Sequence, residues 1–125
     1  MISFNIDIWQ KIKTEFKLYF GEVPEDIEAP FCVMHVLDNG VDDSYSTLCD
    51  DNKVYKADIQ FSVYDYNDMA IDELLINLNN FISQLKDLEK YRIISKQRVR
   101  TRNANGFSAE VGMGYTEYIF TYELL

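Results

Sequence analysis

The sequence predicts one α+β domain in which two helices pack on one face of a mostly antiparallel, four-stranded sheet. Two segments carry apolar residues at helical spacing, and four carry short or alternating apolar runs that are typical of strands. Their order along the chain is α-β-β-α-β-β, with two hairpins and no series of βαβ units. A length of 125 residues suits one domain, so we assign residues 1–125 to it.

The first helix is expected within residues 5–20. Apolar residues recur there at intervals that place them on one stripe of a helix. They are Ile8, Trp9, Ile12, Phe16, Tyr19 and Phe20. Gly21 supplies a C-terminal stop. The segment from Glu22 to Pro30, rich in acids and holding both prolines, is typical of a loop that leads into a strand.

Two strands are expected in the next part of the chain. Phe31 to Leu37 is apolar on both faces, as in a short strand at the centre of a sheet, and Asp38-Asn39-Gly40 has the composition of a turn. Lys53 to Tyr64 alternates between apolar and polar residues, which predicts a strand with one core face. Between them, Val41 to Asn52 is either a long loop or a poor strand.

The second helix is the clearest element of the sequence. Asp68 is a suitable N-cap, and an apolar stripe runs on from Ile71 to Leu88. Alternation returns from Tyr91 to Arg102 and again from Tyr115 to Leu125, which predicts two further strands. The turn-forming residues 103–106 lie between these two strands.

Composition excludes several classes of protein. An apolar fraction of 47% with 14% aromatic residues is too high for a disordered chain. The 21 acidic residues outnumber 12 basic ones, and a net charge of −9 repels phosphate groups, which disfavours general nucleic-acid binding. The first residues lack the features of a signal peptide, and no apolar run is long enough to cross a membrane, so we expect the protein to stay in a cytoplasm.

The sequence has few cysteines and histidines, the residues that most often act in catalysis or bind metals. Cys32 and Cys49 show no CxxC spacing and share the chain with a single histidine, so we expect two free thiols rather than a disulfide framework or a zinc site. That histidine, His35, lies on an apolar strand without a nearby nucleophile in sequence and is interpreted as a core residue.

Two further patterns are weak. The pairs Asp42/Asp43 and Asp50/Asp51 offer ligands for a hard cation, but they lack the spacing of a calcium loop, and we interpret them as solvated turn residues. Gly112-Met113-Gly114 matches part of a phosphate-binding fingerprint but precedes a strand instead of a helix. We therefore expect no catalytic residue, no cofactor and no metal.

The strongest charge pattern is basic. Lys96, Arg98, Arg100 and Arg102 alternate along one predicted strand of an otherwise acidic protein. Such a stripe either protects a sheet edge from aggregation or forms a surface for a partner. A second copy offers a complementary acidic segment from Asp38 to Asp51, and two different patches make a heterologous interface that can close into a ring. The candidate interface residues are Lys96, Arg98, Arg100, Arg102, Asp42, Asp43, Asp50 and Asp51.

With these elements in place, the sequence resembles the tail-completion or tail-terminator proteins of long-tailed bacteriophages. The resemblance rests on the amphipathic first helix, on Pro30-Phe31-Cys32-Val33 at the start of a strand, on Val54 to Asp65 leading into the long helix, and on Tyr115 to Glu123 as the last strand. It covers nearly the whole chain as a pattern of elements. The acidic stretch from Asp38 to Asp51 departs from it.

The resemblance implies a virion structural protein of the neck or tail end. In that family a homo-oligomeric ring, commonly of six copies, ends the tail tube and joins it to the head. The implied partners are the tail tube protein and the head-connector or neck proteins, and DNA passes through the lumen without specific binding. The implied location is the virion, assembled in the host cytoplasm, with no membrane partner.

Two other functions compete with this one. A monomeric cytoplasmic adaptor could dock a protein through its sheet edge or its basic stripe. An enzyme would need a positioned base beside a nucleophile or proton donor, and the sequence shows no such pair.

Overall fold

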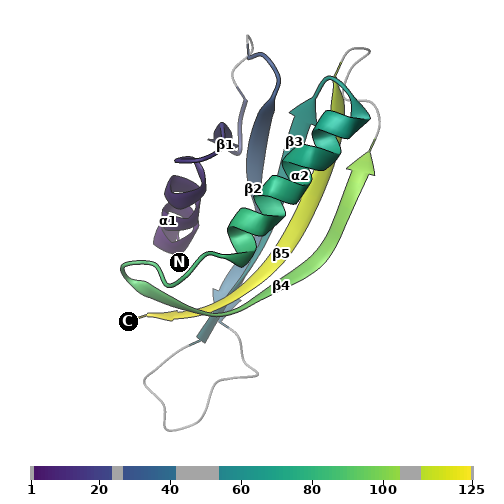
Figure 1. Ribbon diagram of the computed structural model, residues 1–125. Coiled ribbons are helices and arrows are strands. Elements are labelled where there is room, and N and C mark those ends of the chain that lie inside the picture. Colours follow the sequence, from purple (N-terminus) through teal and green to yellow (C-terminus); the bar gives the residue numbers. More distant parts are fainter. Residues whose placement is uncertain (1, 24–26, 42–53, 105–110, 125) are drawn as a thin grey trace, which may run out of the picture.

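The computed structural model describes residues 2–23, 27–41, 54–104 and 111–124. Within them the elements are α1 (Ile2–Ile12), β1 (Leu18–Phe20), β2 (Phe31–Val41), β3 (Val54–Asp65), α2 (Asp68–Ser83), β4 (Tyr91–Ala104) and β5 (Gly112–Leu124). The strands form one sheet in the order β1-β2-β3-β5-β4, and both helices lie on the same side of it (Figure 1). The α+β class is confirmed. The sheet has five strands in place of the four expected, and β1 pairs with β2 in parallel.

The fifth strand comes from the region expected to extend the first helix. α1 ends at Ile12, and a turn follows in which the Phe16 amide donates to the Ile12 carbonyl at 3.1 Å. Leu18 then pairs with Cys32 of β2, and the Trp9 indole donates to the Leu18 carbonyl at 3.0 Å. At the edge of β2, residues 18–20 find backbone hydrogen-bond partners, and the aromatic Tyr19 and Phe20 are favoured in strands. The segment therefore pairs with β2 and does not continue the helix. Gly21 ends β1 instead of a helix, with a φ of 80°.

β2 is longer than expected because the predicted turn Asp38-Asn39-Gly40 lies inside it. The register shifts between Val36 and Asp38, a β-bulge that puts Asn39 opposite the core residue Ala57. There the Tyr122 hydroxyl donates to Asn39 Oδ1 at 3.0 Å, and Asn39 Nδ2 donates to Asn5 at 3.2 Å. The turn prediction is wrong because a bulge and two side-chain hydrogen bonds accommodate these polar residues within a strand.

α2 starts where the sequence indicated and ends earlier. Asn67, and not Asp68, is the N-cap, since its side chain accepts from the Ala70 amide at 2.8 Å. The helix ends at Ser83, and the apolar stripe continues outside it through Leu85 and Leu88, which are both buried.

The last two strands form a long antiparallel pair. β4 runs to Ala104, so it includes the first two residues of the predicted turn, and β5 begins at Gly112. β4 carries two register shifts, one between Ile93 and Ser95 and the other between Arg98 and Arg100. On its other side, β5 pairs with β3 without interruption, so β5 lies between a regular neighbour, β3, and the irregular edge strand β4.

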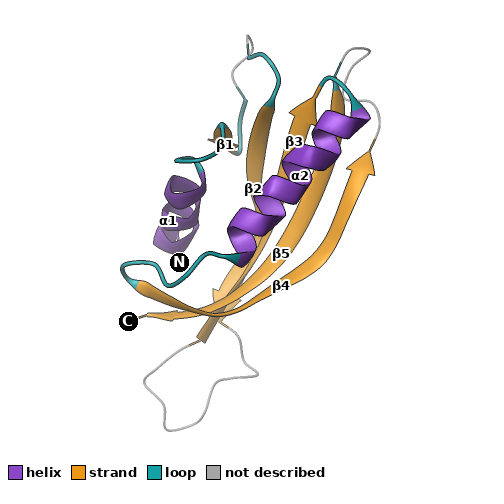
Figure 2. Ribbon diagram, viewed as in Figure 1, coloured by secondary structure: helices purple, strands orange, loops and turns teal. Residues whose placement is uncertain are grey.

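The two faces of the sheet differ in composition. The helix-covered face packs against α1 and α2 (Figure 2) and holds the main core, in which the Phe4 ring stacks on Tyr122 at 3.7 Å. The helix-free face has a small apolar cluster at one end, around Phe31, Val33 and Tyr64. Polar residues that pair across neighbouring strands occupy the middle of that face, including Gln60 opposite Glu117.

Candidate protein interface

The register of β4 on β5 changes within the predicted basic stripe. Lys96 pairs with Phe120 and Arg98 with Tyr118, so both belong to the helix-covered face. After the bulge, Arg100 pairs with Glu117 and Arg102 with Tyr115, positions of β5 that belong to the other face. The bulge between Arg98 and Arg100 therefore interrupts the regular alternation on which the predicted stripe was based. The expected acidic partners, Asp42, Asp43, Asp50 and Asp51, lie outside the described residues.

Lys96 stabilises its own chain. Its Nζ donates to three backbone carbonyls at the C-terminal end of α2, those of Ile82 at 3.2 Å, Ser83 at 2.8 Å and Leu85 at 2.6 Å. A cation is favourable there because the last carbonyls of a helix lack backbone donors and carry partial negative charge. Burial lowers the pKa of this ammonium group. The sequence pattern gave no sign of this cap, because α2 and Lys96 meet only through the fold.

Arg98 is exposed beside a depression between α2 and β4. The depression has a volume of about 380 Å³ and is lined by Asn79, Asn80, Ser83, Lys96, Arg98 and Tyr118. Two of these side chains are cations, and the others offer amide or hydroxyl groups. Within the part of the chain that the structure describes, no carboxylate lines this depression. Its chemistry suits a carboxylate from outside better than a cation.

The base of the depression is held rigidly. Asn79 Oδ1 accepts from the Thr116 hydroxyl at 2.8 Å and from the Tyr118 hydroxyl at 2.7 Å, and all three residues are buried. Burial raises the pKa of the Tyr118 hydroxyl, and the nearby positive charge of Arg98 offsets part of that rise. A buried polar network of this kind joins α2 firmly to β5.

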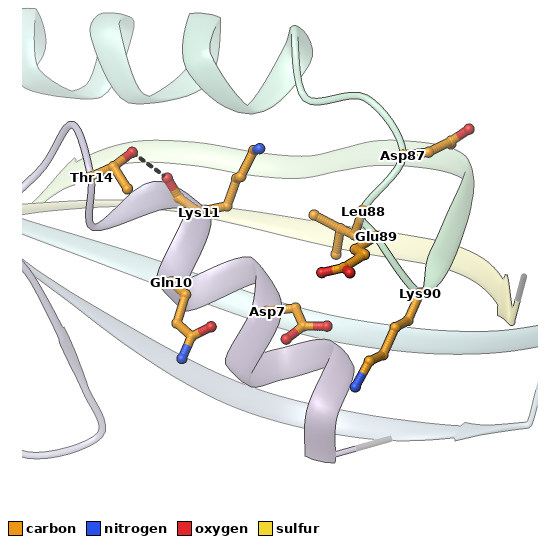
Figure 3. A pocket seen from close by; sticks show the side chains of 8 residues that line it. All are labelled: Asp7, Gln10, Lys11, Thr14, Asp87, Leu88, Glu89 and Lys90. Atoms are coloured by element: carbon orange, nitrogen blue, oxygen red, sulfur yellow. Dashed lines mark hydrogen bonds between the residues drawn. The ribbon is translucent and has the colours of Figure 1, made fainter.

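A second depression lies between α1 and the segment that joins α2 to β4 (Figure 3). Its volume is about 320 Å³, and Figure 3 shows Asp7 of α1 and Glu89 of the connecting segment at the same opening. The lining is Asp7, Gln10, Lys11, Thr14, Asp87, Leu88, Glu89 and Lys90. The lining holds three acids and two lysines, so the charges nearly balance and give no clear preference for a cation or an anion.

The two cysteines and the single histidine do not lie together in a site within the described residues. Cys32 is a free, buried thiol, and burial raises its pKa to about 12, so it is protonated and a poor nucleophile near neutral pH. Cys49 lies outside the described residues. His35 is half-buried opposite Gln60 on the helix-free face, and not in the core as expected. Among the described residues, no three side chains of His, Cys, Asp or Glu gather as a metal site requires, and no helix is long and apolar enough to cross a membrane.

The outer face of α2 carries exposed aliphatic residues that were not predicted as part of a site. Met69 is 80% exposed and Ile76 is 59% exposed, and Asp72 and Glu73 lie within one turn of both. The apolar stripe of this helix is already buried on its inner side. Their exposure could have been predicted from the sequence, since Met69 and Ile76 both fall outside the apolar stripe that runs from Ile71 to Leu88.

Comparison with protein-family models gives no match, and comparison of the sequence with curated proteins gives none either. Among solved structures, the chain is similar to a chain in the virion of a native gene transfer agent particle. The TM-score is 0.62 at 10% sequence identity, over 93% of this chain and 84% of that chain. At this identity the similarity is one of fold.

Proposed function

We propose that this protein is a virion structural component of a phage-like particle, located at the neck or tail end. Copies form a ring, of six in the family that the sequence resembles, which ends the tail tube and joins it to the head. The observation that carries the proposal is the similarity of fold, over 93% of the chain, to a component of a gene transfer agent virion. The sequence resemblance to tail-completion proteins supports the same kind of particle.

The surface chemistry supports a role in assembly. Exposed aliphatic side chains lie beside charged ones on both α2 and β4, as at the contacts between protein subunits. The net charge of −9 also suits a ring around DNA, because an acidic lumen lets the phosphate backbone pass without sticking. The partners in this proposal are other copies, the tail tube protein and the head-connector proteins, and assembly takes place in the host cytoplasm.

Removal of the gene from the phage or phage-like element that carries it tests the proposal. Electron micrographs of the resulting lysate should show filled heads separated from tails, or tails of irregular length. Normal particles should return when the intact gene is supplied on a plasmid. Particles of normal shape, number and infectivity in the absence of the gene would overturn the proposal.

A biochemical test is independent of that result. Peptide mass spectrometry of purified particles should find this chain at a constant number of copies for each particle, and negative-stain images of the purified protein should show small annuli. Absence of the chain from intact particles would contradict a structural role in the virion.

A further inference from the structure

The outer face of α2 is acidic and partly apolar. The helix carries three acidic residues, Asp68, Asp72 and Glu73, and no basic residue. Met69 and Ile76 are more than half exposed among them. A helix that meets only water normally keeps polar residues on its outer side, so exposed aliphatic residues between carboxylates are typical of a contact surface.

β4 has the complementary composition. It carries five basic residues, Arg92, Lys96, Arg98, Arg100 and Arg102, and no acidic residue. Ile94 and Val99, the residues at its two register shifts, are 40% and 42% exposed. Among the described residues no strand pairs with the outer edge of β4, since β4 is the last strand of the sheet order.

The two bulges limit how β4 can be used. A regular edge strand can accept a further strand by backbone hydrogen bonding, but bulges interrupt the ladder, and positive charges oppose edge-to-edge pairing. Contact through side chains remains available. The depression beside Arg98, with two cations, two amides, two hydroxyls and about 380 Å³ of space, has room for a carboxylate side chain.

We propose that β4 of one copy docks on the outer face of α2 in a second copy. Glu73 of the second copy enters the depression beside Arg98, and Met69 and Ile76 pack near Val99. A second copy is the occupant because charge and exposed aliphatic residues match between two surfaces of the same chain, and Arg98 forms a favourable hydrogen-bonded pair with a carboxylate. The two patches differ, so the contact can be repeated from copy to copy.

This inference rests on the proposed assembly role and specifies its contact. It replaces the acidic segment around Asp42 to Asp51, which the sequence favoured as the partner of the basic strand. The two alternatives predict different responses to a charge exchange between Arg98 and Glu73.

Sedimentation velocity of the full chain at low salt measures how strongly copies of each charge variant associate. Arg98→Glu alone and Glu73→Arg alone should each weaken association between copies at least about tenfold, and the double variant should recover to within about threefold of the wild type. Lys86→Glu is the matched control, since it makes the same change in net charge at an exposed residue that does not line the depression, and it should leave association within about twofold. Thermal unfolding of every variant confirms that the fold is retained.

Three outcomes overturn the inference. Unchanged association of Arg98→Glu excludes β4 as the contact. A double variant as weak as the single variants excludes α2 as its partner and favours the acidic segment. A wild-type protein that stays monomeric at every concentration excludes the contact itself. Failure of the charge exchange leaves the proposed function standing if the gene-removal experiment still gives separated heads and tails, so the two tests fail separately.

Discussion

The two faces of the sheet keep polar groups from water in different ways. On the helix-covered face, two asparagines accept hydrogen bonds from tyrosine hydroxyls: the half-buried Asn39 from Tyr122, and the buried Asn79 from Tyr118. On the helix-free face, Ser62, Thr121 and Glu117 are at most 6% exposed, although neither α1 nor α2 covers them. Helices contribute much of the core on one face, whereas the other face is built from strand residues, so substitutions on the two faces should differ in their cost.

The largest contrast is expected for an aromatic residue under α1. Phe4 is fully buried and stacks on Tyr122, so Phe4→Ala should lower the free energy of unfolding by about 3 to 5 kcal/mol. Urea denaturation followed by circular dichroism measures this. The control is Leu37→Ala, a change at an aliphatic residue that is 51% exposed, which should cost less than about 0.5 kcal/mol. Equal losses would show that α1 does not hold the core as described.

Alkaline pH should destabilise the protein through buried groups on the helix-covered face. Burial raises the pKa of the Tyr122 hydroxyl from 10.0 to about 12. The unfolded chain therefore loses this proton first, and stability should fall as pH rises from 10 toward 12, by on the order of 2 kcal/mol from this group. Cys32 acts in the same direction from pH 9 upward, since its pKa is raised from 9.0.

The variant Tyr122→Phe separates these two contributions. It should be less stable than the wild type at neutral pH, because Asn39 loses a donor, and it should show a smaller loss between pH 10 and 12. Thermal unfolding at a series of pH values provides the comparison. An unchanged slope in the variant would contradict the assignment to Tyr122.

A smaller effect is expected at the end of α2. Lys96→Met removes the donor for three carbonyls while it keeps much of the side-chain volume, and it should lower the free energy of unfolding by about 1 to 2 kcal/mol. Chemical denaturation measures the loss. Hydrogen exchange should show faster opening of the last turn of α2. Full stability in this variant would mean that solvent replaces the lysine without cost.

The smallest effect is expected one residue later. Gln97 is exposed and pairs with Ile119 on the helix-free face, so Gln97→Ala should change the free energy of unfolding by less than about 0.5 kcal/mol. The same denaturation experiment gives the value. A loss as large as that of Lys96→Met would show that this part of the helix-free face contributes more than its exposure indicates.

Much of the fold could be predicted from local patterns. The alternation of Ala57, Ile59, Phe61 and Val63 gave β3 nearly to the residue, since period-two burial is encoded in adjacent positions. The start of α2 was predicted within one residue for the same reason. The helical spacing predicted the wrong element for Tyr19 and Phe20, which pair with β2 as a strand. Their partner strand lies far away in sequence, so local spacing could not reveal it.

The candidate site was predicted less well than the fold. Lys96 and Arg98 looked equivalent in sequence, yet one caps α2 and the other stays exposed beside the depression. Alternation also suggested one continuous stripe, and a bulge after Arg98 moved Arg100 to a register position on the other face. A bulge depends on the partner strand, so the spacing of basic residues could not reveal it.

The sequence by itself determined the class of the protein: two amphipathic helices, long alternating strands, an acidic surface and basic residues gathered in one strand. These properties follow from composition and from periods of two and 3.6 residues, which need no distant partner. Only the tertiary structure decided the fifth strand, the three bulges, the asparagine and tyrosine pairs and the register shift within the basic strand. Those features depend on hydrogen bonds between residues far apart in the chain, and the fold alone brings such residues together.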